Sequence, residues 1–191
     1  MTTMFPDWSK ALPVLGVSGM RLRALREDDG AAWYAYLSQE AVIRHTSWRL
    51  DGPGDLAELI RAYAQPDLSH SVRWAIVGPD DQLAGTIGLN EIAPAHRRAE
   101  IAYDIAPAFW RQGLASKACA AVSDWALLVQ GFARIQATVL DSNAASAAVL
   151  DRCRYRREGL LHAYRMVRGE PRHFWMYARI WPPPVVGAEC G

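Results

Sequence analysis

Residues 99–116 read AEIAYDIAPAFWRQGLAS and decide the fold. The first seven residues alternate as in a β-strand, with Ala99, Ile101, Tyr103 and Ile105 on one face and Glu100, Ala102 and Asp104 on the other. A helical stripe follows, made of Leu114, Ala118, Ala121, Val122, Trp125, Leu128 and Val129, and Gly131 is placed to end that helix. The turn between strand and helix is predicted to present free backbone N–H groups, favoured by the helix dipole, to a phosphate group.

The turn alone fits a nucleotide site, an acyl-CoA site or an ordinary helix start. A dinucleotide site needs G-x-G-x-x-G, and Gly113 is the one glycine in this turn. The Gly-Lys-Ser/Thr ending of a phosphate-binding loop is also missing. These comparisons weigh against a nucleotide site without removing it, and they leave the acyl-CoA site and the plain helix start as the main alternatives.

Composition predicts one ordered domain. The chain has 191 residues, 51% of them hydrophobic, and 8 Trp. Its net charge of +1 indicates neither a nucleic-acid nor a membrane partner. The five His and three Cys lack metal or disulfide spacing, so no metal is expected, and Cys119 and Cys153 are interpreted as small buried residues. No signal peptide or long apolar run is recognised, which favours a cytoplasmic location.

Hydrophobic periodicity predicts a mixed α/β or α+β sheet with helices packed on it. Strands are expected at 20–25, 72–77, 83–92, 99–105, 134–140, 155–164 and 172–180. Helices are expected at 27–39, near 42–44, and at 55–64, 114–129 and 143–153. Residues 1–19 are expected to be irregular, and the tail 181–191 extended or disordered.

Four stretches in this order resemble the GNAT N-acetyltransferase superfamily, in its ribosomal-protein-alanine acetyltransferase (RimJ/RimL-like) branch. They are MRLRALREDDGAAW from residue 20, QEAVIRHTSW from residue 39, AEIAYDIAPAFWRQGLASKA from residue 99 and DSNAASAAVLDRCRYRREG from residue 141. The resemblance implies a single N-acetyltransferase domain over residues 20–180, with the GNAT acyl-CoA N-acyltransferase fold. That fold has a mixed, mostly antiparallel twisted sheet of six to seven strands with flanking helices.

The resemblance implies acetyl-CoA as co-substrate. Gly113-Leu114-Ala115 matches the end of the family's acetyl-CoA motif, Trp110 stands where Arg or Gln is usual, and Arg111 replaces a common Gly. The implied cofactor-binding residues are Tyr103, Asp104, Ile105, Arg111, Gln112, Gly113, Leu114, Ala115, Ser116, Asn143 and Ser146.

The reaction implied by the family is attack of a primary amine on the acetyl thioester. Glu100 is the candidate general base; Glu91 is its rival and Asp104 a weaker candidate. Asn143 is either a helix cap or a ligand of the pantetheine arm, and Ser146 would face the thioester sulfur. Many relatives carry a Tyr acid where this chain has Leu150, which leaves Ser146, water or no acid at all.

The expected acceptor is a protein N-terminal α-amine or a small-molecule amine. Trp33, His45, Trp48 and Glu91 are the candidate substrate-binding residues, with His45 and Trp48 favoured to face the pocket. A homodimer is possible. The competing hypotheses are a catalytically inactive acyl-CoA-binding or sensing domain and a nucleotide-binding module.

Overall fold

The computed structural model describes residues 6–8, 10–47, 50–65 and 70–182, so Trp48 lies outside the described residues. Seven strands form one sheet in the order β1-β2-β3-β4-β5-β7-β6. They are β1 (Arg21–Ala24), β2 (Val72–Val77), β3 (Leu83–Ala93), β4 (Arg98–Ile105), β5 (Arg134–Leu140), β6 (Arg156–Val167) and β7 (Glu170–Ile180). Every neighbouring pair is antiparallel except β4 and β5. The predicted mixed, mostly antiparallel fold is confirmed.

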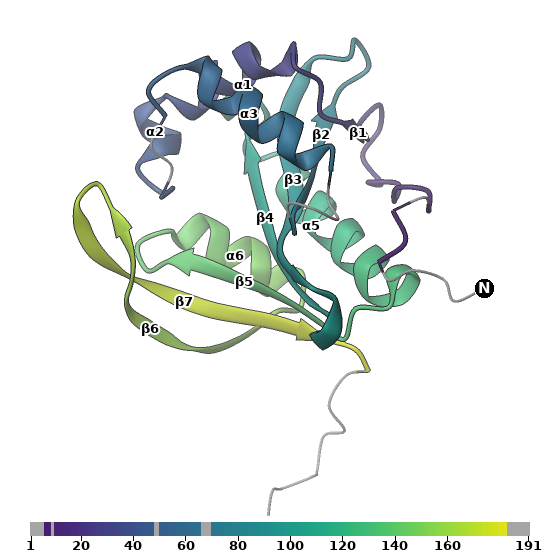
Figure 1. Cartoon of the computed structure of the whole chain (residues 1–191), viewed down its shortest axis with the longest axis vertical. Coiled ribbons are helices and arrows are strands. Elements are labelled where there is room, and N and C mark those ends of the chain that lie inside the picture. Colours follow the sequence, from purple (N-terminus) through teal and green to yellow (C-terminus); the bar gives the residue numbers. More distant parts are fainter. Residues whose placement is uncertain (1–5, 9, 48–49, 66–69, 183–191) are drawn as a thin grey trace, which may run out of the picture.

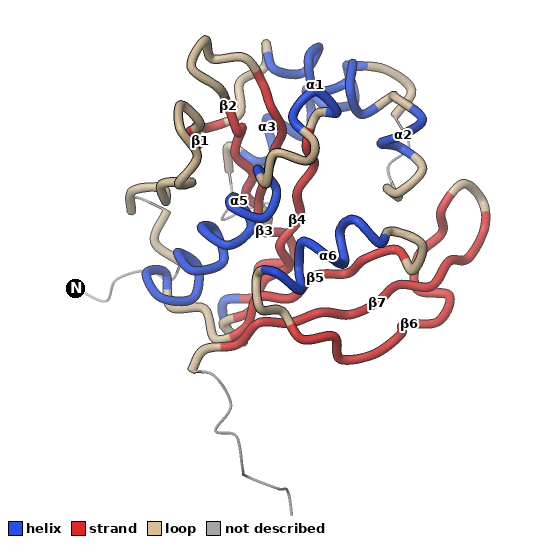
Figure 2. The backbone as a smooth tube through the Cα atoms, turned by 180° about the vertical axis from the view of Figure 1, so that it is seen from behind, coloured by secondary structure: helices blue, strands red, loops and turns tan. Residues whose placement is uncertain are grey.

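Helices cover both faces of the sheet. They are α1 (Asp29–Leu37), α2 (Glu40–Ile43), α3 (Pro53–Tyr63), α5 (Leu114–Asp124) and α6 (Ala144–Arg152). Helices α1 to α3 lie together beside β2 to β4 (Figure 1), whereas α5 and α6 lie in front of the strands in the view from behind (Figure 2). Of the described helices, none combines the length and the apolar character that crossing a bilayer requires.

The described residues form two larger apolar clusters and a small one made of Leu140, Val167 and Phe174. One face of β2, β3, β4 and β5 packs against α5 through residues such as Ile87, Ile101 and Ile135. The second cluster joins α1 to α3 around Trp33 and Leu56, both fully buried. Glu100 and Asp104 belong to the opposite face of β4 from Ile101, as the alternation predicted.

The end of the predicted long helix differs from expectation. Helix α5 stops at Asp124 and continues as a π-helical segment, Trp125–Gln130. The wider π turn shifts the inward face, so that Leu127 is buried while Leu128 and Val129 are 54% and 49% exposed. Leu128 and Val129 were therefore wrongly assigned to the buried stripe. Gly131, at φ 88°, ends the segment as predicted.

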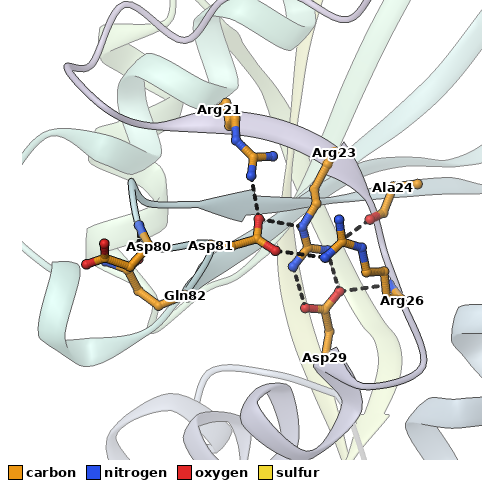
Figure 3. Close-up of polar contacts among 8 residues, drawn as sticks. All are labelled: Arg21, Arg23, Ala24, Arg26, Asp29, Asp80, Asp81 and Gln82. Carbon is orange, nitrogen blue, oxygen red and sulfur yellow. Dashed lines mark hydrogen bonds and ion pairs between the residues drawn. The ribbon is translucent and has the colours of Figure 1, made fainter.

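An arginine–carboxylate network ties the start of α1 to β1 and to the turn between β2 and β3 (Figure 3). Asp29 accepts two hydrogen bonds from Arg23, at 2.7 and 2.8 Å, and one from the backbone N–H of Arg26. Asp81 accepts hydrogen bonds from Arg21, Arg23 and Arg26. The network therefore fixes α1 against the sheet edge, and α1 in turn contacts β4 through hydrogen bonds from Trp33 and Tyr36 to Asp104.

Replacing Asp81 by Asn should destabilise the protein at pH 7, and the difference from the wild type should shrink in acid. Hydrogen bonds from Arg23, followed by those from Arg21, lower the pKa of Asp81 below its ordinary value. A carboxylate with a lowered folded-state pKa contributes its full stability above the unfolded pKa and loses it as pH falls through the folded pKa. Urea unfolding of both proteins at pH 7 and pH 3 measures this difference.

Asp80 is the matched control for Asp81, since its side chain points away from the arginines in Figure 3. The Asp80→Asn variant should unfold like the wild type at both pH values. A gap between Asp81→Asn and the wild type that stayed constant from pH 7 to pH 3 would show that the Asp81 charge is not what stabilises this turn.

Candidate active site

The site begins where β4 and β5 separate. The two strands pair only from Arg98↔Arg134 to Glu100↔Gln136 and then diverge (Figure 1). Strand β4 keeps its pairing with β3 as far as Ile105, and β5 keeps its pairing with β7 as far as Leu140. Each strand therefore has one edge without a strand partner, and these two edges face a common gap.

A cavity of about 620 Å³ occupies this gap. Residues 100–105 of β4 and 137–140 of β5 line it, together with the start of α5, much of α6 and residues of α2. The unpaired backbone N–H and C=O groups of the strand edges can bind a ligand that has amide groups of its own. The cavity is thus suited to an elongated ligand lying between the strands.

The start of α5 forms one wall of the cavity. Gly113 has φ 75°, and the first bond of the helical ladder runs from Lys117 N–H to Gly113 C=O. The N–H groups of residues 114–116 therefore precede the ladder, in a region where the helix dipole favours an anion. Residues 111 and 113–116 line the cavity, as a phosphate seat requires.

Two neighbouring side chains support the turn, and Trp110 of these two also lines the cavity. Trp110 donates from Nε1 to the Ile105 carbonyl at 2.7 Å, which holds the turn against the end of β4. Gln112, a predicted cofactor ligand, is directed away from the lining and donates to the Ala108 carbonyl at 3.0 Å.

Glu100 is buried in the cavity wall, at 4% exposure. Its Oε1 accepts hydrogen bonds from Thr138 Oγ1 at 2.8 Å and from an Arg165 Nη at 3.2 Å. Its Oε2 is buried and has no hydrogen-bond partner among the described residues. Because a buried polar atom without a partner is costly, Oε2 is available for a donor on a ligand.

The two rival carboxylates lie in different surroundings. Asp104 lines the cavity, but its oxygens accept hydrogen bonds from Trp33, Tyr36, Arg73 and Thr86. Burial, followed by the negative charge of Asp104, raises the pKa of Tyr36 and keeps that donor protonated. Asp104 therefore acts as a structural acceptor. Glu91 lies on an exposed bulge outside the cavity lining, 3.7 Å from Arg165.

A pair of hydroxyl groups crosses the cavity between β4 and α6. Tyr103 Oη lies 3.0 Å from Ser146 Oγ, and burial raises the pKa of Tyr103, so the phenol stays protonated. Asn143 caps α6 by accepting from Ser146 N–H at 3.0 Å, and Asn143 also lines the cavity. Leu150 is fully buried in the core. The contact between Tyr103 and Ser146 was not anticipated from the sequence.

The predicted acceptor residues are only partly brought together. His45 lines the cavity. Trp33 does not: it is 0% exposed in the core under α1 and donates from Nε1 to Asp104 at 3.2 Å, which corrects its assignment as a substrate-binding residue. The helical pattern of α1 was compatible with either position, and only the packing of α1 on β3 decided between them.

Sequence reasoning missed the two partners of Glu100. Thr138 and Arg165 are separated from it by 38 and 65 positions along the chain. Arg165 reaches the site because the β6–β7 hairpin bends toward it (Figure 1), where its guanidinium lies 5.0 Å from the Tyr164 ring. No local pattern marks either residue, since both contacts depend on how the strands pair.

Comparison with known proteins identifies the family to which this chain belongs. The family described as Acetyltransferase (GNAT) domain matches residues 20–156. The uncharacterized N-acetyltransferase YoaA of Bacillus subtilis (strain 168) is 31% identical over 173 residues, which cover 89% of this chain and 98% of YoaA. A spermidine N(1)-acetyltransferase of Escherichia coli (strain K12) is 26% identical over 155 residues, covering 81% of this chain and 82% of that protein.

The fold is also shared with a solved structure. The ribosomal-protein-S5-alanine acetyltransferase of Vibrio fischeri superimposes with a TM-score of 0.77 at 17% identity, covering 87% of this chain and 97% of that one. The family match spans most of the chain, and YoaA aligns along nearly its whole length. This chain therefore belongs to the GNAT acetyltransferase family and is an N-acetyltransferase.

Proposed function

We propose that this enzyme transfers an acetyl group from acetyl-CoA to a primary amine, with Glu100 as general base. The observation that carries the proposal is the separation of β4 from β5 immediately after Glu100, which opens the cavity between the start of α5 and α6. Acetyl-CoA matches this cavity chemically. Its pantetheine amides suit the unpaired strand edges, and its phosphates suit the N–H groups at the start of α5.

The amine must lose a proton, because amines are largely protonated at neutral pH. Thr138 and Arg165 hold Glu100 through Oε1, and Oε2 remains free to accept the amine proton. The nitrogen lone pair then attacks the thioester carbonyl carbon. A backbone N–H at the unpaired edge of β4 would donate to the oxygen that becomes negative.

Collapse of this intermediate breaks the carbon–sulfur bond and releases the CoA thiolate. Ser146 on α6 and Tyr103 on β4 lie together, and both line the cavity. We assign to Ser146, backed by the protonated Tyr103, the hydrogen bond to the departing sulfur. This arrangement replaces the tyrosine acid that Leu150 cannot supply.

Calorimetric titration with acetyl-CoA, with NAD and ATP as controls, tests the donor. We expect micromolar binding of acetyl-CoA and no binding of either control. Thiol release from acetyl-CoA in the presence of an amine panel then tests transfer. An absence of acetyl-CoA binding would overturn the proposal, and binding without transfer to any amine would leave the chain as an acyl-CoA-binding domain.

A further inference from the structure

The end of the cavity at Arg44 and His45, where we expect the amine acceptor to bind, carries positive charge that no ion pair among the described residues neutralises. Arg44 lines the cavity beside His45, and neither Arg44 nor Arg168 has an ion-pair partner among the residues that the structure describes. Arg168, at the turn between β6 and β7, donates to the backbone carbonyls of Ile43 and Arg44. Both guanidinium groups lie close enough to His45 for their charges to act on it, and Arg44 is the one of the two that lines the cavity.

Two other arginines of the cavity lining are paired with carboxylates. Arg73 pairs with Asp104 at 2.9 Å, and both side chains are almost completely buried. Arg165 lies 3.2 Å from Glu100 and 3.7 Å from Glu91. Arg111 and Arg152 also line the cavity without an ion pair among the described residues, but they lie on the turn before α5 and at the end of α6. Beside His45, the charge of the cavity lining that has no ion pair within the described part of the chain is that of Arg44.

His45 presents a hydrogen-bond donor to the cavity. Burial, followed by the charges of Arg44 and Arg168, lowers the pKa of His45, so the imidazole is neutral at pH 7. Its Nε2 accepts a hydrogen bond from Arg44 Nε at 3.1 Å, which places the proton on Nδ1. Nδ1 is buried without a partner among the described residues. An oxygen of a ligand would satisfy this donor.

The cavity lining thus includes a buried acceptor without a hydrogen-bond partner among the described residues, Glu100 Oε2, and a buried donor in the same condition, His45 Nδ1–H. A ligand that satisfies both must supply an N–H to Glu100 and an oxygen to His45. The neighbouring guanidinium groups favour an oxygen that carries negative charge, since charge-assisted hydrogen bonds are the stronger ones.

We infer that the acceptor is an amine that also carries an anionic oxygen group, a carboxylate or a phosphate, bound by His45 and Arg44. The inference rests on the proposed transfer to an amine and narrows its acceptor. A polyamine offers no oxygen to His45 and adds positive charge beside two free guanidinium groups, so the site rejects it. The enzyme differs in this respect from the spermidine N(1)-acetyltransferase to which its sequence is similar.

Pairs of acceptors that differ in one anionic group test the inference. Each is titrated calorimetrically into the protein saturated with CoA, so that binding is measured without turnover. The first pair is alanyl-aspartyl-glycinamide and alanyl-asparaginyl-glycinamide, the second is 2-aminoethyl phosphate and ethanolamine, and spermidine is the cationic probe. We expect the anionic member of at least one pair to bind about tenfold more tightly than its neutral partner. The pair with the larger ratio distinguishes a carboxylate from a phosphate.

Substitutions at Arg44 and His45 test whether these two residues cause the preference for anionic acceptors. Arg44→Gln and His45→Phe should each reduce the anionic-to-neutral ratio to about twofold or less. Arg61→Gln is the matched control, because Arg61 is an exposed guanidinium on α3 that faces Glu27 and lies outside the cavity lining. It removes the same charge and should retain the tenfold ratio.

Acetylation rates with the same compounds separate this inference from the proposed function. Transfer to neutral amines or spermidine as efficient as transfer to their anionic counterparts would overturn the inference and leave the amine acetyltransferase standing. Equal binding within both pairs would overturn it as well. Acetyl-CoA binding with no transfer to any compound would instead overturn the proposed function.

Discussion

Replacing Glu100 by Gln is expected to lower kcat by at least about 100-fold, with the dissociation constant for acetyl-CoA changed by less than about twofold. An amide has nearly the shape of the carboxylate and can still accept the Thr138 hydrogen bond through its oxygen. It cannot accept the amine proton at the other position, where Oε2 now lacks a partner. Steady-state thiol release gives kcat, and calorimetry gives the acetyl-CoA affinity.

Two further glutamates make this experiment decisive. Glu58→Gln makes the same change on the exposed side of α3 and should behave as the wild type. Glu91→Gln tests the rival base on the exposed bulge. A 100-fold loss of kcat in Glu91→Gln, together with full activity in Glu100→Gln, would move the base to Glu91 and remove Glu100 from the mechanism.

Replacing Asp104 by Asn is expected to lower the free energy of unfolding by about 3–5 kcal/mol, because it leaves the buried Arg73 guanidinium without its counterion. The carboxylate also accepts from Thr86 at 2.8 Å and from Trp33 at 3.2 Å, so the substitution disturbs contacts to two elements at once. Urea unfolding followed by tryptophan fluorescence measures the loss.

A surface pair provides the control for Asp104. Asp141 lies 3.6 Å from Arg172, and both side chains are about one-third exposed, so Asp141→Asn should cost no more than about 1 kcal/mol. The folded fraction of Asp104→Asn should retain most of its kcat, as expected of a structural carboxylate. Unchanged stability with a large loss of kcat would instead return Asp104 to the list of candidate bases.

The sequence predicted the bounds of a strand correctly where a run of β-branched and apolar residues ends at turn or loop residues. The runs 72–77 and 134–140 were predicted to the residue, because the β-branched and apolar side chains of buried strands are bounded there by turn or loop residues. The end of α5 was not predicted, since a π-helical segment begins there at Trp125, whose ring centroid lies 5.5 Å from that of Trp74. Helical spacing assumes a constant turn, and this helix does not keep one.

Part of the candidate site could likewise be predicted from the sequence, and part of it could not. Its turn, with Gly113 before α5, is local in the chain and was predicted from the sequence to bind a phosphate group; the structure places it in the cavity wall. Trp33 was misplaced, since an aromatic residue on a helix suits a pocket or a core equally well until the helix is docked. The uncompensated charges of Arg44 and Arg168 also became visible only once the β6–β7 turn met α2.

The sequence by itself determined the family, the order of the elements and the strand–turn–helix unit at residues 99–124, because these depend on periodicity and on residue types close together in the chain. The tertiary structure alone decided which carboxylate is free. Glu100 and Asp104 share one face of one strand, yet Asp104 is surrounded by four donors while Glu100 keeps an oxygen without a partner. Hydrogen-bond satisfaction is set by residues distant in the chain, so it appears only when the strands and helices are assembled.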